Sequence, residues 1–259
     1  MSMRTLPARL HSFRAFRLFL VLVIVTLAIS PALAAAQKQV SKRFPAGKSV
    51  RLVIRNISGK VTVESWDRDE VKVSATIESP SANVVPKQVS DGVLVDVMGD
   101  NRGRGDVGNV NFRVQVPANF SVDIATLNGD ITINNIRSKA VRAHITADGD
   151  IELIGIVSPT VFAQNMTGNI FFDGEVSRGG SYQFQAGKGD ISIRIPANSA
   201  FDLTASAPDK RLALGQFWNS GFRTVGEGKK FSKTVVEVND GRAKVLIRNF
   251  DGGITFVRR

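Results

Sequence analysis

Cysteine is absent from this chain of 259 residues, and only one of its two histidines, His144, lies beyond residue 36. The lack of cysteine excludes disulfides, cysteine nucleophiles and thiolate metal sites, and one histidine cannot build a zinc site that needs several. No Gly-x-Ser-x-Gly elbow and no complete phosphate-binding loop is present. His144 alternates out of phase with the apolar Ala143 and Ile145, so we expect it to face solvent. We predict no catalytic residue, no cofactor and no metal.

The first 36 residues have the pattern of a secretory signal peptide. Four arginines and no acidic residue precede an apolar run at residues 18–30, and small residues follow it. Cleavage is expected after Ala34 or Ala36, which places the mature chain in the periplasm, on the outer surface or outside the cell. An uncleaved anchor is the alternative, because residues 18–36 are about long enough to cross a hydrocarbon core of ~30 Å.

Basic residues are concentrated near the C-terminus. Residues 208–259 carry eleven Lys or Arg and five Asp or Glu, whereas the preceding part of the mature chain is nearly balanced. A basic region on an exported protein suits an anionic partner. We expect an anionic envelope component (a polysaccharide or a lipid headgroup) or another envelope protein, rather than nucleic acid. A charged face that only keeps the protein dispersed is the alternative.

Apolar and polar residues alternate with period two through most of residues 48–259, and no sustained helical periodicity follows residue 36. A short unit, a glycine turn followed by alternating apolar residues, occurs four times, at residues 128–133, 148–153, 167–172 and 188–193. The glycines of these units are 20, 19 and 21 residues apart. A fixed period near twenty is typical of stacked coils. We predict an all-β, single-domain β-solenoid or β-helix-like stack of short strands, with a β-sandwich as the alternative.

Further similarities lie outside the central repeats. Residues 50–63 match residues 243–256 in register, and the segment VQVPAN at residues 114–119 is similar to IRIPAN at residues 193–198. The domain at residues 37–259 is therefore expected to contain regular rungs at about 48–78 and 110–205 and a final rung at 235–259. The segment at 208–230 is irregular, basic and aromatic.

Glycine and the polar residue after it form the predicted turn of each unit. The turn positions are Gly59, Gly129, Asp130, Gly149, Asp150, Gly168, Asn169, Gly189, Asp190 and Gly252. Stacked rungs would place the Asp and Asn side chains roughly 4.8 Å apart. Such a row suits a cation or a retaining glycosidase, but tight turns need Asp and Asn in any case. We interpret the row as turn-forming.

The aromatic residues divide into two groups. Five phenylalanines of the repeats are expected to fill the core or stack between rungs: Phe162, Phe171, Phe172, Phe184 and Phe201. The irregular segment supplies a tentative binding surface of rings and basic residues: Arg211, Phe217, Trp218, Phe222, Arg223, Lys229 and Lys230. The alternative for this segment is a hydrophobic cap that closes one end of the solenoid.

The sequence IRNISGKVTV at residues 54–63, followed by WDRDEVKV at 66–73 and the repeated Asn/Asp-Gly-Asp-Ile units, resembles the bacterial "putative adhesin" family of exported domains of unknown function. The resemblance covers roughly residues 48–256. It implies a β-solenoid-like envelope domain and offers no catalytic motif to carry over. We expect a non-catalytic binding, adhesin-like or scaffolding module. The alternatives are a solenoid enzyme acting on acidic polysaccharide and an envelope-stress regulatory component with a protein partner.

Overall fold

The computed structural model describes residues 38–46, 51–79, 82–208, 211–217, 223–227 and 231–259. Residues 37–259 form a single compact unit. The predicted signal peptide, with its cleavage site, lies outside the described residues. No helix in the ranges given above is long and apolar enough to cross a membrane.

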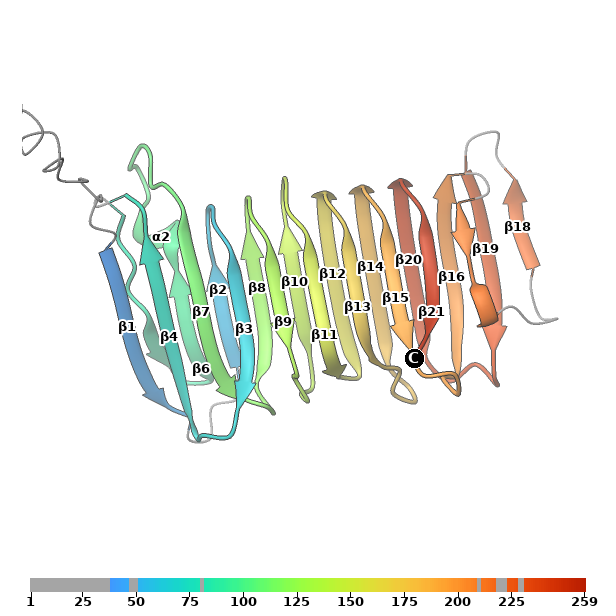
Figure 1. Cartoon of the computed structure of the whole chain (residues 1–259), viewed down its shortest axis with the longest axis horizontal. Coiled ribbons are helices and arrows are strands. Elements are labelled where there is room, and N and C mark those ends of the chain that lie inside the picture. Colours follow the sequence, from blue (N-terminus) through green and yellow to red (C-terminus); the bar gives the residue numbers. More distant parts are fainter. Residues whose placement is uncertain (1–37, 47–50, 80–81, 209–210, 218–222, 228–230) are drawn as a thin grey trace, which may run out of the picture. The chain divides into compact units, whose positions relative to one another are not determined.

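The described strands form two sheets, and the strands of each lie side by side in Figure 1. Sheet A has the spatial order β1 (Lys38–Pro45), β4 (Glu70–Ile77), β7 (Val110–Pro117), β3 (Val61–Trp66), β9 (Ile131–Asn134), β11 (Ile151–Val157), β13 (Ile170–Glu175), β15 (Ile191–Ile195), β21 (Ile254–Arg258) and β17 (Leu212–Ala213). Sheet B has the order β18 (Arg223–Glu227), β19 (Phe231–Val238), β16 (Phe201–Pro208), β20 (Lys244–Asp251), β14 (Ser181–Lys188), β12 (Thr160–Thr167), β10 (Val141–Ile145), β8 (Ser121–Thr126), β2 (Arg51–Arg55), β6 (Gly92–Asp96) and β5 (Lys87–Val89). Two short helical segments, α2 (Val97–Asp100) and η1 (Gly215–Phe217), are also described.

Six pairs of consecutive strands form the rungs of a parallel stack. In each rung a strand of sheet B passes through a glycine turn into a strand of sheet A; the spatial order is β2–β3, β8–β9, β10–β11, β12–β13, β14–β15 and β20–β21. Neighbouring rungs pair in register, so that Ile131 lies between Val61 and Ile151. Inward residues of both sheets fill one continuous apolar core. The predicted all-β, β-solenoid-like fold is confirmed.

Antiparallel strands lie at both ends of the stack. At one end β1, β4 and β7 pair antiparallel in sheet A, and β5 pairs antiparallel with β6 in sheet B. At the other end β19 pairs antiparallel with β16 and β18. The predicted region of regular rungs at 48–78 therefore contains one parallel rung, β2–β3, together with β4, which does not stack in parallel.

The spatial order of the rungs departs from the chain order at two places. After β7 the chain passes over the β2–β3 rung into β8, and after β15 it passes over the β20–β21 rung into β16. The two Pro-Ala-Asn segments make these connections. In each, a backbone N–H returns to the proline carbonyl, from Phe120 to Pro117 (3.0 Å) and from Ser199 to Pro196 (3.1 Å). Each rung that the chain passes over is formed by one of the two long matching segments. The two sequence similarities therefore describe the same arrangement at both ends of the stack.

The turn glycines form a column in which each backbone lies against the next. A Cβ on Gly168 would lie less than 3.0 Å from the carbonyl oxygen of Gly149, and φ at Gly168 is +119°. The same approach occurs at Gly129, Gly149, Gly189 and Gly252, each against the glycine of the preceding rung, although Gly252 does not have a positive φ. Only glycine fits, because both the approach and the positive φ exclude a side chain.

Buried asparagines support this column from inside. The Asn165 Nδ2 donates to the carbonyl of Gly149 (3.1 Å), and the Asn249 Nδ2 donates to that of Gly189 (2.9 Å). Both side chains are at least 97 % buried. These bonds satisfy carbonyls that would otherwise lie unpaired beside the core.

Candidate functional site

The predicted Asp and Asn row connects one rung to the next. The Asp130 Oδ1 accepts from the backbone N–H of Asp150 (3.1 Å), and the Asp150 Oδ1 accepts from that of Asn169 (2.6 Å). The Asn169 Oδ1 accepts from Asp190, and the Asp190 Oδ1 accepts from Gly253 at 2.7 Å. Each side chain thus binds a backbone donor of the neighbouring turn. The described residues contain no group of three or more His, Asp or Glu side chains placed to hold a metal ion.

The tentative binding surface of the irregular segment is described only in part. Phe217 is 2 % exposed and packs against the rings of Phe201 (6.0 Å between centroids) and Phe256 (6.2 Å), so it belongs to the core and not to a surface. Arg211 is exposed and pairs with Asp251 at 3.3 Å. The backbone of Arg223 lies in β18. Trp218, Phe222, Lys229 and Lys230 lie outside the described residues.

The outer faces of the two sheets differ in charge. In the six parallel rungs, the strands of sheet B carry six Arg or Lys and two Asp. The corresponding strands of sheet A carry two Arg and four Asp or Glu. Four of the sheet-B bases have no carboxylate partner within the described ranges: Arg142, Lys188, Lys244 and Arg248. Within the six parallel rungs of the described residues, sheet B therefore presents uncompensated positive charge.

Charges on sheet A are mostly paired with each other. Asp173, 5 % exposed, pairs with Arg194 (2.5 Å) and Arg259 (3.5 Å), and Arg259 also binds Glu175. The Arg194 guanidinium lies over the ring of Phe171 at 5.6 Å. Because these groups satisfy one another, they form a structural network and leave little free charge on the parallel rungs of this face.

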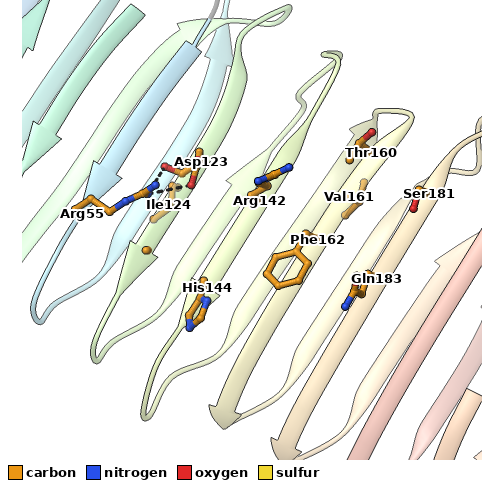
Figure 2. Close-up of a pocket in the computed structure, with 11 residues that line it drawn as sticks. Arg55, Asp123, Ile124, Arg142, His144, Thr160, Val161, Phe162, Ser181 and Gln183 are labelled. Atoms are coloured by element: carbon orange, nitrogen blue, oxygen red, sulfur yellow. Dashed lines mark hydrogen bonds and ion pairs between the residues drawn. The ribbon is translucent and has the colours of Figure 1, made fainter. Parts of the chain in front are cut away.

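A hollow of about 430 Å³ lies on the basic face (Figure 2). Register places Arg142 directly between Asp123 on β8 and Phe162 on β12, and Gln183 on β14 lies beside Phe162. His144, also on β10, forms a second row with Ala125 and Arg55. The side chain of Ala125 is small, so a gap is left between the longer side chains of Arg55 and His144. Thr160 and Ser181 line one margin of the hollow.

Asp123 is held at the edge of the hollow by two guanidinium groups. Its carboxylate accepts from Arg51 (2.8 Å) and Arg55 (3.0 Å). Burial raises the pKa of Asp123, but the hydrogen bonds and charges of Arg55 and Arg51 outweigh it, so the net pKa lies below the usual 3.8. The charge of this carboxylate is thus compensated, and among the described residues Arg142 is the guanidinium of the hollow that has no carboxylate partner.

A second hollow of about 730 Å³ lies closer to the glycine turns on the same face. It forms because Gly187 has no side chain between Met166 and Phe250, which are 60 % and 53 % exposed. Lys188 lines it as well. Two exposed apolar side chains thus lie beside a lysine near the glycine-turn ends of the sheet-B strands.

Charge read along the chain, and not strand by strand, does not reveal this face. His144 was expected to face solvent, and it lies half-exposed on the outer face of sheet B. Phe162 and Phe171 were expected to fill the core or stack between rungs, and for these two residues the expectation of core filling was wrong. Phe172, Phe184 and Phe201 are buried, whereas Phe162 and Phe171 lie on outer faces. The alternation of Val161 and Ala163 already contained this information.

The family model described as Toastrack DUF4097 matches residues 43–255. The chain belongs to the Toastrack DUF4097 family. This agrees with the resemblance found in the sequence. None of the curated proteins compared with this Toastrack domain matches it.

Two solved structures are similar to this Toastrack domain. One is a putative cell adhesion protein from Clostridium sporogenes, with 11 % identity, a TM-score of 0.48, and coverage of 86 % of this chain and 100 % of that chain. The other is a putative adhesin from Bacteroides fragilis, with 8 % identity, a TM-score of 0.36, and coverage of 85 % and 97 %. At these scores and identities, neither similarity carries an argument about a ligand.

Proposed function

We propose that this Toastrack domain is an exported, non-catalytic binding module of the cell envelope, and that the outer face of sheet B takes an anionic partner. The observation that carries this proposal is the charge difference between the two faces. Arg142, Lys244 and Arg248 share this outer face, and Lys188 lies at its glycine-turn edge, all without carboxylate partners in the described part of the chain. Keeping like charges on one face costs free energy unless a partner neutralises them.

The Asp row does not favour the enzymatic alternative. Its oxygens accept backbone N–H groups of the next rung, so the side chains serve the stack. The residues lie on exposed turns, where solvent is not excluded from a reaction. No feature of the described residues favours a regulatory role with a protein partner over direct binding of an anion.

Binding is tested with anionic probes and their neutral counterparts. The purified protein is titrated with polygalacturonate and with phosphatidylglycerol vesicles, and then with dextran and phosphatidylcholine vesicles. Binding of at least one anionic probe and of neither neutral probe is expected. The double variant Lys244→Gln/Arg248→Gln should weaken that binding roughly 5- to 10-fold, because two charge contacts are lost. The matched control Lys38→Gln/Lys42→Gln removes two exposed charges from β1 of sheet A and should change nothing. Equal binding to neutral and anionic probes would refute the proposal.

Export is tested on the protein recovered from cell fractions. N-terminal sequencing should find Ala35 or Gln37 as the first residue, outside the cytoplasm. Protein that retains Met1 in the membrane fraction would show an anchor, and protein confined to the cytoplasm would contradict the envelope role.

A further inference from the structure

We propose that the hollow formed by Arg55, Arg142, His144, Phe162 and Gln183 is a binding site for an acidic polysaccharide whose carboxylates are carried on sugar rings. This inference rests on the proposed function and gives it a ligand class and a site. Three features of the hollow support it: a free guanidinium, a ring accessible on an outer face, and polar side chains with unused hydrogen-bonding capacity.

The guanidinium without a carboxylate partner, as far as the described segments go, is that of Arg142. Asp123 is adjacent in register, but its carboxylate is taken by Arg51 and Arg55, and Arg142 is exposed. A guanidinium donates two parallel hydrogen bonds to a carboxylate, a geometry that lysine cannot provide. Arg142 is therefore suited to bind the carboxylate of a uronic acid.

The ring of Phe162 lies next to Arg142 on the adjacent strand, in register with it (Figure 2). It is half-buried, so its position is set by the strand while its face stays accessible. A sugar ring has an apolar face of C–H groups, and an aromatic side chain supplies a matching apolar surface. Neighbouring strands are about 4.8 Å apart, so one saccharide unit contacts Phe162 and Arg142 together.

Gln183 continues the row on β14, and His144 lies along β10 from Arg142. Within the described residues no protein group hydrogen-bonds the Gln183 amide, which can donate and accept. Thr160 and Ser181 add hydroxyls at the margin. Sugar hydroxyls, which occur on every ring of a polysaccharide, use this mixture of donors and acceptors.

A bilayer surface is the competing anion, and its contacts would differ. It would engage the protruding Met166 and Phe250 of the second hollow together with Lys188 and Arg248. The first hollow instead combines a guanidinium and polar side chains with the single ring of Phe162. Binding of a polysaccharide and binding of a bilayer therefore depend on different residues, and variants of those residues distinguish the two.

The test uses isothermal titration calorimetry with oligogalacturonate on the full protein, with neutral cello-oligosaccharide and phosphatidylglycerol vesicles in parallel. Oligogalacturonate should bind, and Arg142→Gln should weaken it about 10- to 100-fold, the value of a lost charge-assisted bond pair. Phe162→Leu, which keeps bulk but removes the ring, should weaken it several-fold. The matched control Arg113→Gln, on the outer face of sheet A, should leave it unchanged. Melting temperatures check that each variant is folded.

The outcomes separate this inference from the proposed function. If oligogalacturonate binds and Arg142→Gln has no effect, while Lys244→Gln/Arg248→Gln weakens binding, the anionic partner stands and the hollow is not its site. If vesicles bind and oligogalacturonate does not, the ligand is a membrane and the polysaccharide site is refuted. If no anionic probe binds, the proposed function fails and the site fails with it.

Discussion

At the scale of single residues, this chain uses side chains to position backbone. The Asp and Asn after each glycine accept a backbone N–H from the next rung, and buried asparagines donate to glycine carbonyls of the same column. The Asp and Asn row, a candidate for catalysis or metal binding, thus uses its side-chain oxygens in hydrogen bonds that hold the stack together. Residues with unused capacity, Arg142 and Gln183, lie on the outer face of sheet B.

The glycine column gives a sharp residue-scale prediction. Gly168→Ala should lower the free energy of unfolding by about 2 kcal/mol or more, because the new Cβ meets the Gly149 carbonyl and the residue has a positive φ. For a domain of this size, a loss of 1 kcal/mol lowers Tm by roughly 2–4 °C, so a fall of about 4–8 °C is expected in a thermal melt. The control is Gly105→Ala, where the Cβ meets nothing within 4 Å and φ is not positive. Equal melting temperatures for the two variants would contradict the column as the source of register.

The Asp123 ion pairs predict a dependence on pH. Because the folded-state pKa of Asp123 is lowered, its stabilising effect is present above the ordinary value of 3.8 and is lost as pH falls through the folded-state pKa. In chemical denaturation, Asp123→Asn should be less stable than the natural protein at pH 7, and the difference should shrink at the acidic end. An NMR titration should place the Asp123 midpoint below 3.8. The exposed Asp251, substituted by Asn, serves as control. A pH-independent difference would show that Asn disturbs packing and not charge.

At the scale of elements, the two skipped rungs are the main departure from a simple coil. After β15 the chain does not place its next strand, β16, directly beside β14, because no glycine turn follows β16, which ends at Pro208. In the β20–β21 rung, Gly252 lies against Gly189, and the Asn249 side chain donates to the Gly189 carbonyl. This rung therefore continues the glycine column and occupies the position next to β14–β15. The glycine turn thus determines which segment stacks on β14–β15, and β16 lies one rung further out.

Removal of β20–β21 tests this arrangement. A protein truncated after residue 241 leaves β16 paired only with β19, and β14 and β15 without their outer neighbours. Because each rung contacts only adjacent rungs, amide exchange should rise sharply in residues 181–195 and 201–208 and stay low in residues 121–145. Deleting β1, which pairs only with β4, is the control and should leave residues 181–195 protected. Unchanged protection after truncation would mean that β14 pairs directly with β16.

At the scale of the whole domain, the sequence predicts the stack but not its order or its charged face. The twenty-residue period, the glycine turns and the alternation suffice for the solenoid, because each reflects local geometry. The order of the rungs depends on pairing between strands far apart in the chain, such as β14 with β20, which a periodic pattern does not specify. The charge of the sheet-B face is scattered along the chain, since successive strands alternate between sheets. Counting the charged residues of the first and the second strand of each rung separately would have revealed the charged face.

The charge difference between the faces predicts a footprint for the bound ligand. Lysine acetylation with and without oligogalacturonate should show Lys188 and Lys244 shielded several-fold, because Lys188 lines the second hollow and Lys244 lies in register with Ser181 of the first. Lys42, exposed on β1 of sheet A, is the internal control and should react equally in both samples. Raising the ionic strength to 1 M shortens the Debye length to about 3 Å and should remove the shielding. Equal shielding of Lys42 would show that the polymer coats the protein without preference for a face, and a binding module built on the segregation of charge between the two sheets would then be wrong.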